Sequence, residues 1–308
     1  MKLSTAWSGY IFYADARGLS QYTIDDYRRT IEKFIQHAGD RHVCEFTKAD
    51  IESFLATPAM KKLSLKTRLN YHTGLAAIWT WLIKEEVATD HIVRAVDPPD
   101  PPDPDIIPFT EQDVQLLLAN IDRSKLYKRN FQHEPSSHRP PNALRNRAII
   151  LTLLDTGLRN SELCDLRIDD INLRNREIKV RAGKGGKDRH VHFCAKTGKV
   201  IWRYLSTRAA AGDGEALFTI GDGLHLSPRG LGLMLSRLGK KAGVKDCYPH
   251  RFRHTFALNY LRNGGDAFTL QKLLGHSDMT MTRRYLNLAK QDTAVRHHAA
   301  SPVANWNI

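Results

Sequence analysis

The stretch DPPDPPDPD, from Asp97 to Asp105, divides this sequence into two parts. Five of its nine residues are prolines. Proline has a fixed backbone angle and no backbone N–H to donate, so neither the interior of a helix nor a central strand accepts such a run. The stretch therefore predicts an extended linker over residues 97–105, between one domain over residues 1–96 and a second over residues 106–308.

The part before the linker carries apolar residues at the spacing of amphipathic helices. Three runs follow this pattern, and each starts near a residue that can cap a helix, namely Ser20, Thr47 or Ser64. A further helix is expected around residues 7–14. The sequence thus predicts an all-helical bundle for the first domain. The apolar faces of the three runs consist of Ile24, Tyr27, Ile31, Phe34 and Ile35, of Ile51, Phe54 and Leu55, and of Leu65, Leu69, Leu75, Trp79, Leu82 and Ile83.

The part after the linker begins with two more helical patterns. Thr110 is suited to cap the first of these helices, and Gly157 is suited to end the second. Residues 197–289 are again mostly helical in their spacing, and Ser227 followed by Pro228 is typical of a helix start.

Between these helical regions the apolar period changes from helical to alternating. Apolar and charged residues alternate on both sides of Gly185 and Gly186, which is typical of a β-hairpin. We therefore expect a mainly helical protein with one small antiparallel sheet, so that the second domain is an α+β domain.

The charge of the chain is the strongest general clue to its partner. Lys and Arg number 46 against 33 Asp and Glu, a formal net charge of +13. Such an excess attracts polyanions, with nucleic acid as the first choice and an anionic membrane as the second. No apolar run approaches the roughly 18 residues that a spanning helix needs, and the N-terminal residues lack a signal-peptide core. We therefore expect a soluble intracellular protein.

Two further features concern the cysteines and a polar segment. Cys44, Cys164, Cys194 and Cys247 are far apart without paired spacing, so we interpret them as free thiols and not as a zinc site or a disulfide framework. Residues 122–142 are polar, basic and contain prolines, which predicts a long surface loop.

Four segments carry the residues of chemical interest: TGLRNSEL, GKGGKDR, HRFRH and LLGHSDMTMTRRY. Each has an ordinary structural explanation when taken alone, such as an arginine paired with Glu162, a solvated turn lysine, a helix-surface pair or a packed tyrosine. The candidates within them are Arg159, Lys184, His250, Arg253, His276 and Tyr285.

Taken together, these six residues supply what phosphodiester transfer without a metal requires. Arginine forks match phosphate oxygens, a tyrosine hydroxyl is a nucleophile, and lysine or histidine can move protons. Free tyrosine has a pKa of about 10 and is a poor nucleophile at neutral pH, so neighbouring guanidinium and imidazole groups would serve to activate it. No convincing carboxylate cluster argues for a two-metal nuclease. We therefore expect neither a metal nor an organic cofactor.

In this order, the four segments resemble the motifs of the tyrosine recombinase family, which includes phage integrases and Xer-type recombinases. The resemblance implies that Tyr285 attacks the scissile phosphate to form a 3′-phosphotyrosyl bond, while Arg159 and Arg253 clamp that phosphate. It also implies that Lys184, and not the nearby Lys187, protonates the leaving 5′ oxygen. The remaining implied roles are proton transfer and phosphate binding for His250 and His276, and orientation of the site for Glu162.

The resemblance further implies a helical, SAM-like core-binding domain before the linker and a catalytic domain after it. The expected partner is double-stranded DNA, with a homotetramer bound at two DNA sites. A second recombinase is a possible further partner. The expected location is the cytoplasm, in association with the nucleoid. The segment from about residue 288 to 308 either docks on a neighbouring protomer or is a frayed terminus. Two other functions stay open: relaxation of DNA like a type IB topoisomerase, and regulation by a DNA-binding protein without catalysis.

Overall fold

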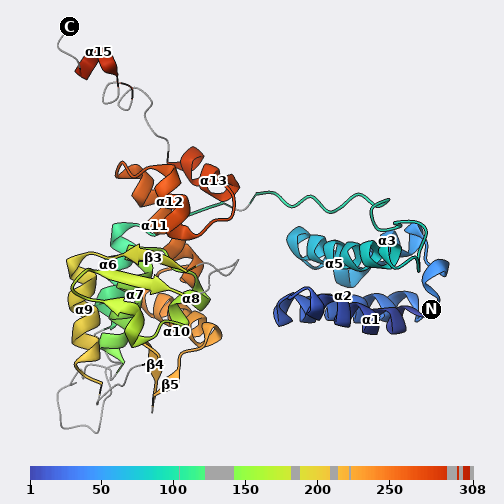
Figure 1. The fold of residues 1–308 in the computed structure, drawn as a ribbon, viewed down its shortest axis with the longest axis horizontal. Helices are drawn as coiled ribbons and strands as arrows, with labels where there is room; N and C mark the ends of the chain where they lie inside the picture. Colours follow the sequence, from blue (N-terminus) through green and yellow to red (C-terminus); the bar gives the residue numbers. More distant parts are fainter. Residues whose placement is uncertain are drawn as a thin grey trace. The chain divides into compact units, whose positions relative to one another are not determined.

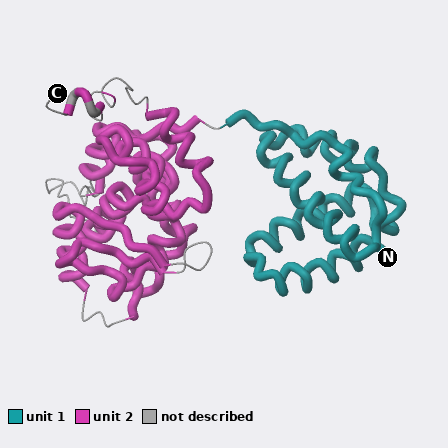
Figure 2. Tube along the Cα trace, turned by 45° about the horizontal axis from the view of Figure 1, so that its top comes forward, with its two compact units in different colours: residues 1–104 teal, residues 105–308 magenta. Residues whose placement is uncertain are grey.

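The computed structural model describes residues 1–103, 105–121, 142–181, 188–208, 214–221, 223–289, 297 and 301–305. The chain forms two compact units, residues 1–104 and residues 105–308 (Figure 2). The loop predicted for residues 122–142 lies almost entirely outside the described residues. No helix in the described part of the chain is long and apolar enough to cross a membrane.

The first unit is all-helical, as the sequence predicts. Its α-helices are α1 (Leu3–Ala16), α2 (Gln21–Ala38), α3 (Lys48–Leu55), α4 (Pro58–Lys61) and α5 (Leu65–Lys84), with a short 3-10 turn at Val43–Glu45 (Figure 1). Most of the predicted apolar faces pack into one core, in which Phe34 and Trp79 are almost fully buried. The prediction was wrong for Leu65, which is exposed at the first position of α5, and Leu69 does not belong to the core cluster. The turn of helix α4 was not predicted, because four residues are too few to show a period.

Local capping explains where these helices start. The hydroxyl of Ser20 accepts a hydrogen bond from the backbone N–H of Thr23 at 3.2 Å, and that of Ser64 accepts from Thr67 at 3.1 Å. At the start of α3, the Asp50 carboxylate accepts from the backbone N–H of Thr47 at 2.8 Å. These bonds satisfy backbone donors that have no partner inside a helix, which confirms the predicted starts.

The second unit combines helices with two small antiparallel sheets. Its α-helices are α6 (Glu111–Ile121), α7 (Ala143–Thr156), α8 (Asn160–Cys164), α9 (Ala195–Leu205), α10 (Pro228–Ala242), α11 (Pro249–Arg262), α12 (Ala267–Leu274), α13 (Thr280–Leu288) and α15 (Pro302–Asn305), and Ile168–Asp170 forms a 3-10 turn. The strands are β1 (Ile171–Asn172), β2 (Glu177–Val180), β3 (Arg189–His192), β4 (Thr219–Ile220) and β5 (Leu224–His225).

The predicted hairpin is formed by β2 and β3, with Ile178 opposite Val191. Strand β1 extends this sheet in the order β1-β2-β3, and β4 pairs with β5 in a second sheet. The mainly helical fold with a small antiparallel sheet is therefore confirmed, but the sequence predicted one hairpin where the structure has two sheets. Strands of two residues are too short to show an alternation that could be read from sequence.

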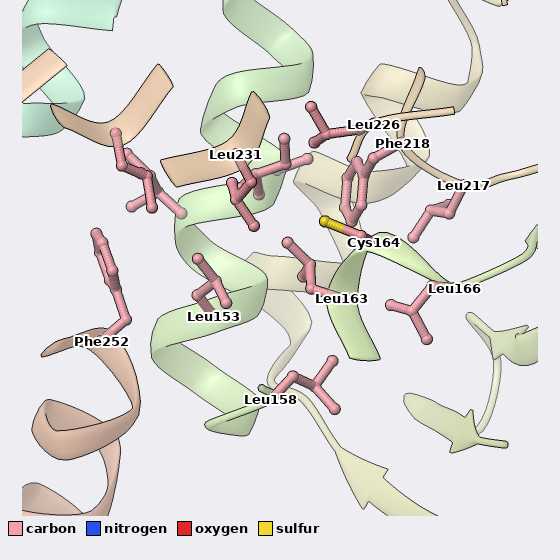
Figure 3. Close-up of a cluster of buried hydrophobic side chains, with 14 of the residues drawn as sticks. Leu153, Leu158, Leu163, Cys164, Leu166, Leu217, Phe218, Leu226, Leu231 and Phe252 are labelled. Carbon is pink, nitrogen blue, oxygen red and sulfur yellow. The ribbon is translucent and has the colours of Figure 1, made fainter. Parts of the chain in front are cut away.

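Two apolar clusters hold the second unit together. The larger is centred on α7 and includes Leu153, Leu231 of α10 and Phe252 of α11, which point into the same cluster in Figure 3. The smaller joins α11, α12 and α13 and contains Tyr285, which is fully buried. In Figure 1, α12 and α13 lie at the end of this unit opposite the β4–β5 sheet.

The turn between α7 and α8 depends on Gly157. Its φ of +63° lies in the left-handed region that favours glycine. A Cβ at this position would also meet Phe256 at 2.4 Å and Leu274 at 2.9 Å, both shorter than side-chain carbons tolerate. The glycine therefore lets the backbone before Arg159 approach α11 and α12, which is where the candidate site lies.

The four cysteines are all free thiols, as predicted. Cys164 and Cys247 are buried, and burial raises the pKa of the Cys164 thiol to about 12 and that of Cys247 to about 11. Both groups are therefore protonated at neutral pH and pack as small apolar residues.

Candidate active site

Helix α11 carries the buried centre of the candidate site. Arg253 is 2% exposed and donates to the Gly157 carbonyl at 2.8 Å and to the Leu274 carbonyl at 2.7 Å. Burial, followed by the charge of Arg159, lowers the pKa of Arg253 to about 10, so this guanidinium is still charged at neutral pH. Arg253 thus joins the turn after α7 to the end of α12 and places a positive charge between them.

Arg159 lies at the start of α8, and its side chain also reaches the end of α12. Its guanidinium donates to the Gly275 carbonyl and to a Glu162 carboxylate oxygen, each at 2.8 Å. Its side chain is 30% exposed, so it is the more accessible of the two arginines. Both arginines donate to adjacent carbonyls at the end of α12, which brings two residues 94 positions apart in sequence to one turn.

Glu162 is held by a second arginine that the sequence analysis did not assign. Arg189, the first residue of β3, donates to the two Glu162 carboxylate oxygens at 2.9 Å and 2.8 Å, and to the Leu273 carbonyl at 2.9 Å. Burial by itself raises the pKa of Glu162, but the bonds from Arg189 and from the backbone of Arg159 outweigh it and bring the pKa to about 2. The charged carboxylate of Glu162 therefore links α8 to the β2–β3 hairpin.

The position of Arg189 has a signal in the sequence, because it ends the quoted segment GKGGKDR. The pairing with Glu162 spans 27 residues and cannot be read from that segment alone. Lys184, from the same segment, lies outside the described residues, as does Lys187. The structure describes the two strands that flank them, β2 and β3.

The two predicted histidines lie close enough to the arginines to feel their charges. His276 follows Gly275 directly, and its Nδ1 lies 3.0 Å from the Thr282 hydroxyl. Burial, then the charges of Arg253 and Arg159, lowers the pKa of His276 to about 4. The same causes in the same order lower the pKa of His250, one turn before Arg253 on α11. Both imidazoles are thus neutral at pH 7.

Tyr285 reaches the site from α13. Its side chain is fully buried, its ring stacks at 6.3 Å from that of His276, and its hydroxyl lies 2.7 Å from Nδ1 of His254. Burial raises the pKa of Tyr285, and the positive charges of Arg253 and Arg284 counteract this only in part. The phenol is therefore protonated and covered by packing, while the charge of Arg253 acts on it.

His254 is the second residue that the sequence analysis did not assign. It is the last residue of the quoted segment HRFRH, directly after Arg253. Its contact with Tyr285 spans 31 residues, so only the packing of α13 on α11 reveals it.

The described candidates thus form one connected group, and Lys184 is the one candidate that the structure does not describe. A small pocket of about 130 Å³ opens at this group and is lined by Arg159, Gly275, His276, Ser277, Asp278 and Met281. A larger cleft of about 960 Å³ between α6 and α11 is lined by none of the described candidates. Within the described ranges, no group of three or more His, Cys, Asp and Glu side chains could hold a metal ion.

Chemically, this group can bind an anion and act on it. The Arg159 guanidinium lines the pocket, the Arg253 guanidinium is buried at the same turn, and imidazoles and a phenol lie beside them. Such a set suits one phosphate group with a nucleophile alongside, because guanidinium forks match its nonbridging oxygens.

Replacing Glu162 with glutamine should lower the free energy of unfolding by about 3 kcal/mol near pH 7. The pKa of Glu162 falls from about 4.5 in the unfolded chain to about 2 in the folded protein, and a difference of this size corresponds to about 3 kcal/mol. The pKa is depressed on folding, so this contribution is present above pH 4.5 and is lost as the pH falls through about 2. The difference in unfolding free energy between wild type and variant should therefore narrow by about 2 kcal/mol between pH 6 and pH 3.

Urea unfolding at both pH values measures this difference. Glu111→Gln is the matched control, because Glu111 is an exposed glutamate on α6 of the same unit. If the difference in unfolding free energy between wild type and Glu162→Gln is the same at pH 6 and pH 3, the charge of Glu162 does not stabilise the contact between α8 and the hairpin.

Known proteins resemble this chain along most of its length. The phage integrase family model matches residues 109–292, and a model for the N-terminal SAM-like domain of phage integrases matches residues 10–89. Tyrosine recombinase XerC of Oceanobacillus iheyensis is 27% identical over 94% of this chain and 93% of its own length. Tyrosine recombinase XerA of Thermococcus kodakarensis is 31% identical over 89% of this chain and 87% of its own length.

Solved structures show the same fold. The Tn1549 transposon integrase, in a complex with a circular intermediate DNA, superposes with a TM-score of 0.73 at 24% identity. The superposition covers 91% of this chain and 94% of that one.

Proposed function

Because this chain belongs to the phage integrase family and is a site-specific tyrosine recombinase, we propose that Tyr285 is the nucleophile with which it cuts and rejoins double-stranded DNA. The observation that supports this assignment most strongly is the meeting of α8, α11 and α13 at one site. There, Arg159 and Arg253 donate to adjacent carbonyls, and the charge of Arg253 acts on the Tyr285 hydroxyl.

In the proposed reaction, the phenolic oxygen of Tyr285 attacks the scissile phosphorus. The new O–P bond forms as the bond from phosphorus to the 5′ oxygen breaks, and the electron pair leaves with that oxygen. Tyr285 passes its proton to a neutral imidazole of the site, His250 or His276, and the 5′ oxygen takes up a proton from Lys184. A 3′-phosphotyrosyl bond and a free 5′ hydroxyl remain. Attack by a 5′ hydroxyl of a second DNA strand reverses these steps and reseals the backbone without ATP.

The arginines would carry the charge that develops in this step. Arg159 is the partly exposed donor at the pocket, and Arg253 is the buried charge behind it. Fixed donors of this kind stabilise a transition state without reorganising, and the loss of one typically costs about 10²–10³ in rate. Glu162 and Arg189 do not face the phosphate in this proposal and instead fix the position of Arg159.

The histidines would respond to the phosphate. His250 and His276 are neutral because burial and the two arginines disfavour a further positive charge. A phosphodiester carries a negative charge, which offsets the arginines and favours the protonated imidazoles. Both histidines can then donate to phosphate oxygens and assist proton transfer.

DNA binding itself would use both units. The net charge of +13 suits many phosphate contacts, so affinity should fall steeply with salt. In this proposal residues 1–96 form the core-binding domain, residues 97–105 the linker, and the remainder the catalytic domain, which together hold the duplex. The Tn1549 integrase in its DNA complex has the same fold, which supports this proposal.

The proposed assembly is a homotetramer on two DNA sites, with pairing to a second recombinase as the alternative. The segment after Tyr285 would reach a neighbouring protomer in a head-to-tail contact, which must close into a ring. We further propose that the protein works in the cytoplasm at the nucleoid, where its DNA lies.

One assay tests the proposed function. The protein is incubated with two duplex fragments of different length, both carrying genomic DNA that adjoins its gene, and the reaction is quenched with detergent. We expect protein-linked DNA and joined fragments of hybrid length. Relaxation of any supercoiled plasmid without hybrid products would instead indicate a topoisomerase, and DNA binding without linked protein would indicate a non-catalytic regulator.

A further inference from the structure

We infer that His254 is a positioning residue for Tyr285, which accepts the hydrogen bond of the nucleophile and sets where its oxygen lies. This inference rests on the proposed function, because it concerns the same hydroxyl. The Nδ1 of His254 lies 2.7 Å from that oxygen, and in the part of the chain that the structure describes it is the one hydrogen-bond partner of the phenol.

Burial gives this single bond its importance. The Tyr285 side chain is fully buried among residues of α11, α12 and α13, so water does not replace a lost partner there. Burying a hydroxyl without a hydrogen-bond partner costs free energy, so the phenol favours the position in which its hydroxyl can donate to an acceptor. His254 therefore decides the direction of the hydroxyl, because the apolar residues of the cluster offer it no hydrogen-bond acceptor.

The position of His254 on α11 links the nucleophile to the phosphate-binding group. His250, Arg253 and His254 stand at i, i+3 and i+4, so they share one face of the helix. The rings of His250 and His254 lie 4.5 Å apart, edge to face. The helix thus presents the arginine and the acceptor for the phenol as neighbours, and the bond to His254 holds the phenolic oxygen at a set place relative to Arg253.

The protonation states favour a positioning role over that of a base. Burial, followed by the nearby His250 and Arg253, lowers the pKa of His254 to about 4, so its imidazole is neutral and can accept at Nδ1. Burial raises the pKa of Tyr285, so the phenol keeps its proton and donates it to that bond. An imidazole this weakly basic is better suited to orient the hydroxyl than to remove its proton.

Two substitutions at this position separate the hydrogen bond from the volume of the ring. His254→Phe keeps an aromatic ring but has no acceptor. His254→Asn loses the ring, but its Oδ1 stands as many bonds from the backbone as the imidazole Nδ1 and can accept the same hydrogen bond. Single-turnover cleavage at saturating DNA, the Kd for DNA and thermal unfolding are measured for both variants and the wild type.

We expect His254→Phe to cleave about 10- to 100-fold more slowly, because small misplacements of a nucleophile have effects of this size. His254→Asn should recover most of this loss, and both variants should bind DNA like the wild type. Equal losses in the two variants would show that the ring only fills space. A His254→Phe variant that cleaves as fast as the wild type, or faster, would overturn the inference.

A DNA substrate with sulfur in place of the scissile 5′ oxygen tests which side of the reaction is affected. A thiolate leaves without being protonated, so this substrate removes any need for an acid. The defect of His254→Phe should persist with the sulfur substrate, and recovery of a wild-type rate would place His254 on the leaving-group side and overturn the inference. If the wild type itself forms no linked DNA, the proposed function fails as well, whereas a normal wild type with an unimpaired His254→Phe variant removes only the role of His254.

Discussion

Replacing Tyr285 with phenylalanine should abolish covalent attachment to DNA and leave the fold and DNA affinity in place. The substitution removes one oxygen, and the ring still fills its place in the cluster of α11, α12 and α13. The lost hydrogen bond to His254 should cost about 1 kcal/mol of stability. Loss of a nucleophile lowers rates by factors of about 10⁴ or more, so no linked DNA should be detected.

Denaturing gels that separate free protein from protein-linked DNA measure this effect, with thermal unfolding and DNA affinity recorded in parallel. Tyr260→Phe is the matched control, because Tyr260 stands on α11 of the same unit and lines the larger cleft away from the candidate group. Linked DNA in the Tyr285→Phe variant would identify a different nucleophile.

Replacing Arg253 with alanine should have the second largest effect, on both cleavage and stability. The lost guanidinium should lower the cleavage rate by about 10²–10³, the usual cost of a donor that stabilises a transition state. Its removal also leaves the carbonyls of Gly157 and Leu274 without their donors and opens a cavity, which together should cost about 3 kcal/mol.

Arg159→Ala separates the two effects. Arg159 is partly exposed, and Glu162 keeps Arg189 as a partner when Arg159 is removed, so this variant should lose cleavage with a smaller loss of stability. Urea unfolding, the yield of linked DNA and the Kd for DNA are compared for both variants. If DNA binding falls in parallel with cleavage, the arginines contribute to affinity and not to the chemical step.

Arg253 also shows why a motif is not a complete description of a site. Its motif predicts that it binds the phosphate, and in the structure the same guanidinium connects the turn after α7 to the end of α12. A single side chain thus serves the fold and the proposed chemistry, which sequence spacing cannot reveal.

Local signals in the sequence determined the secondary structure well. The start of α10 follows from Ser227 and Pro228, and the end of α7 follows from Gly157, because capping and left-handed turns depend on neighbouring residues alone. The β2–β3 hairpin follows from alternation in the same way. The strands β1, β4 and β5 could not be predicted, since two residues carry no period.

The sequence by itself also determined which side chains are suited to act on a phosphate, because six residues of four types with the required chemistry stand in four recognisable segments. Only the tertiary structure decided that Arg189 braces Glu162 and that His254 holds Tyr285, although both residues stand inside those segments. The physical reason is that these bonds join residues on different elements, and their formation depends on how β3 meets α8 and how α13 packs on α11. The burial of the Tyr285 hydroxyl arises in the same way, from contacts that no local pattern encodes.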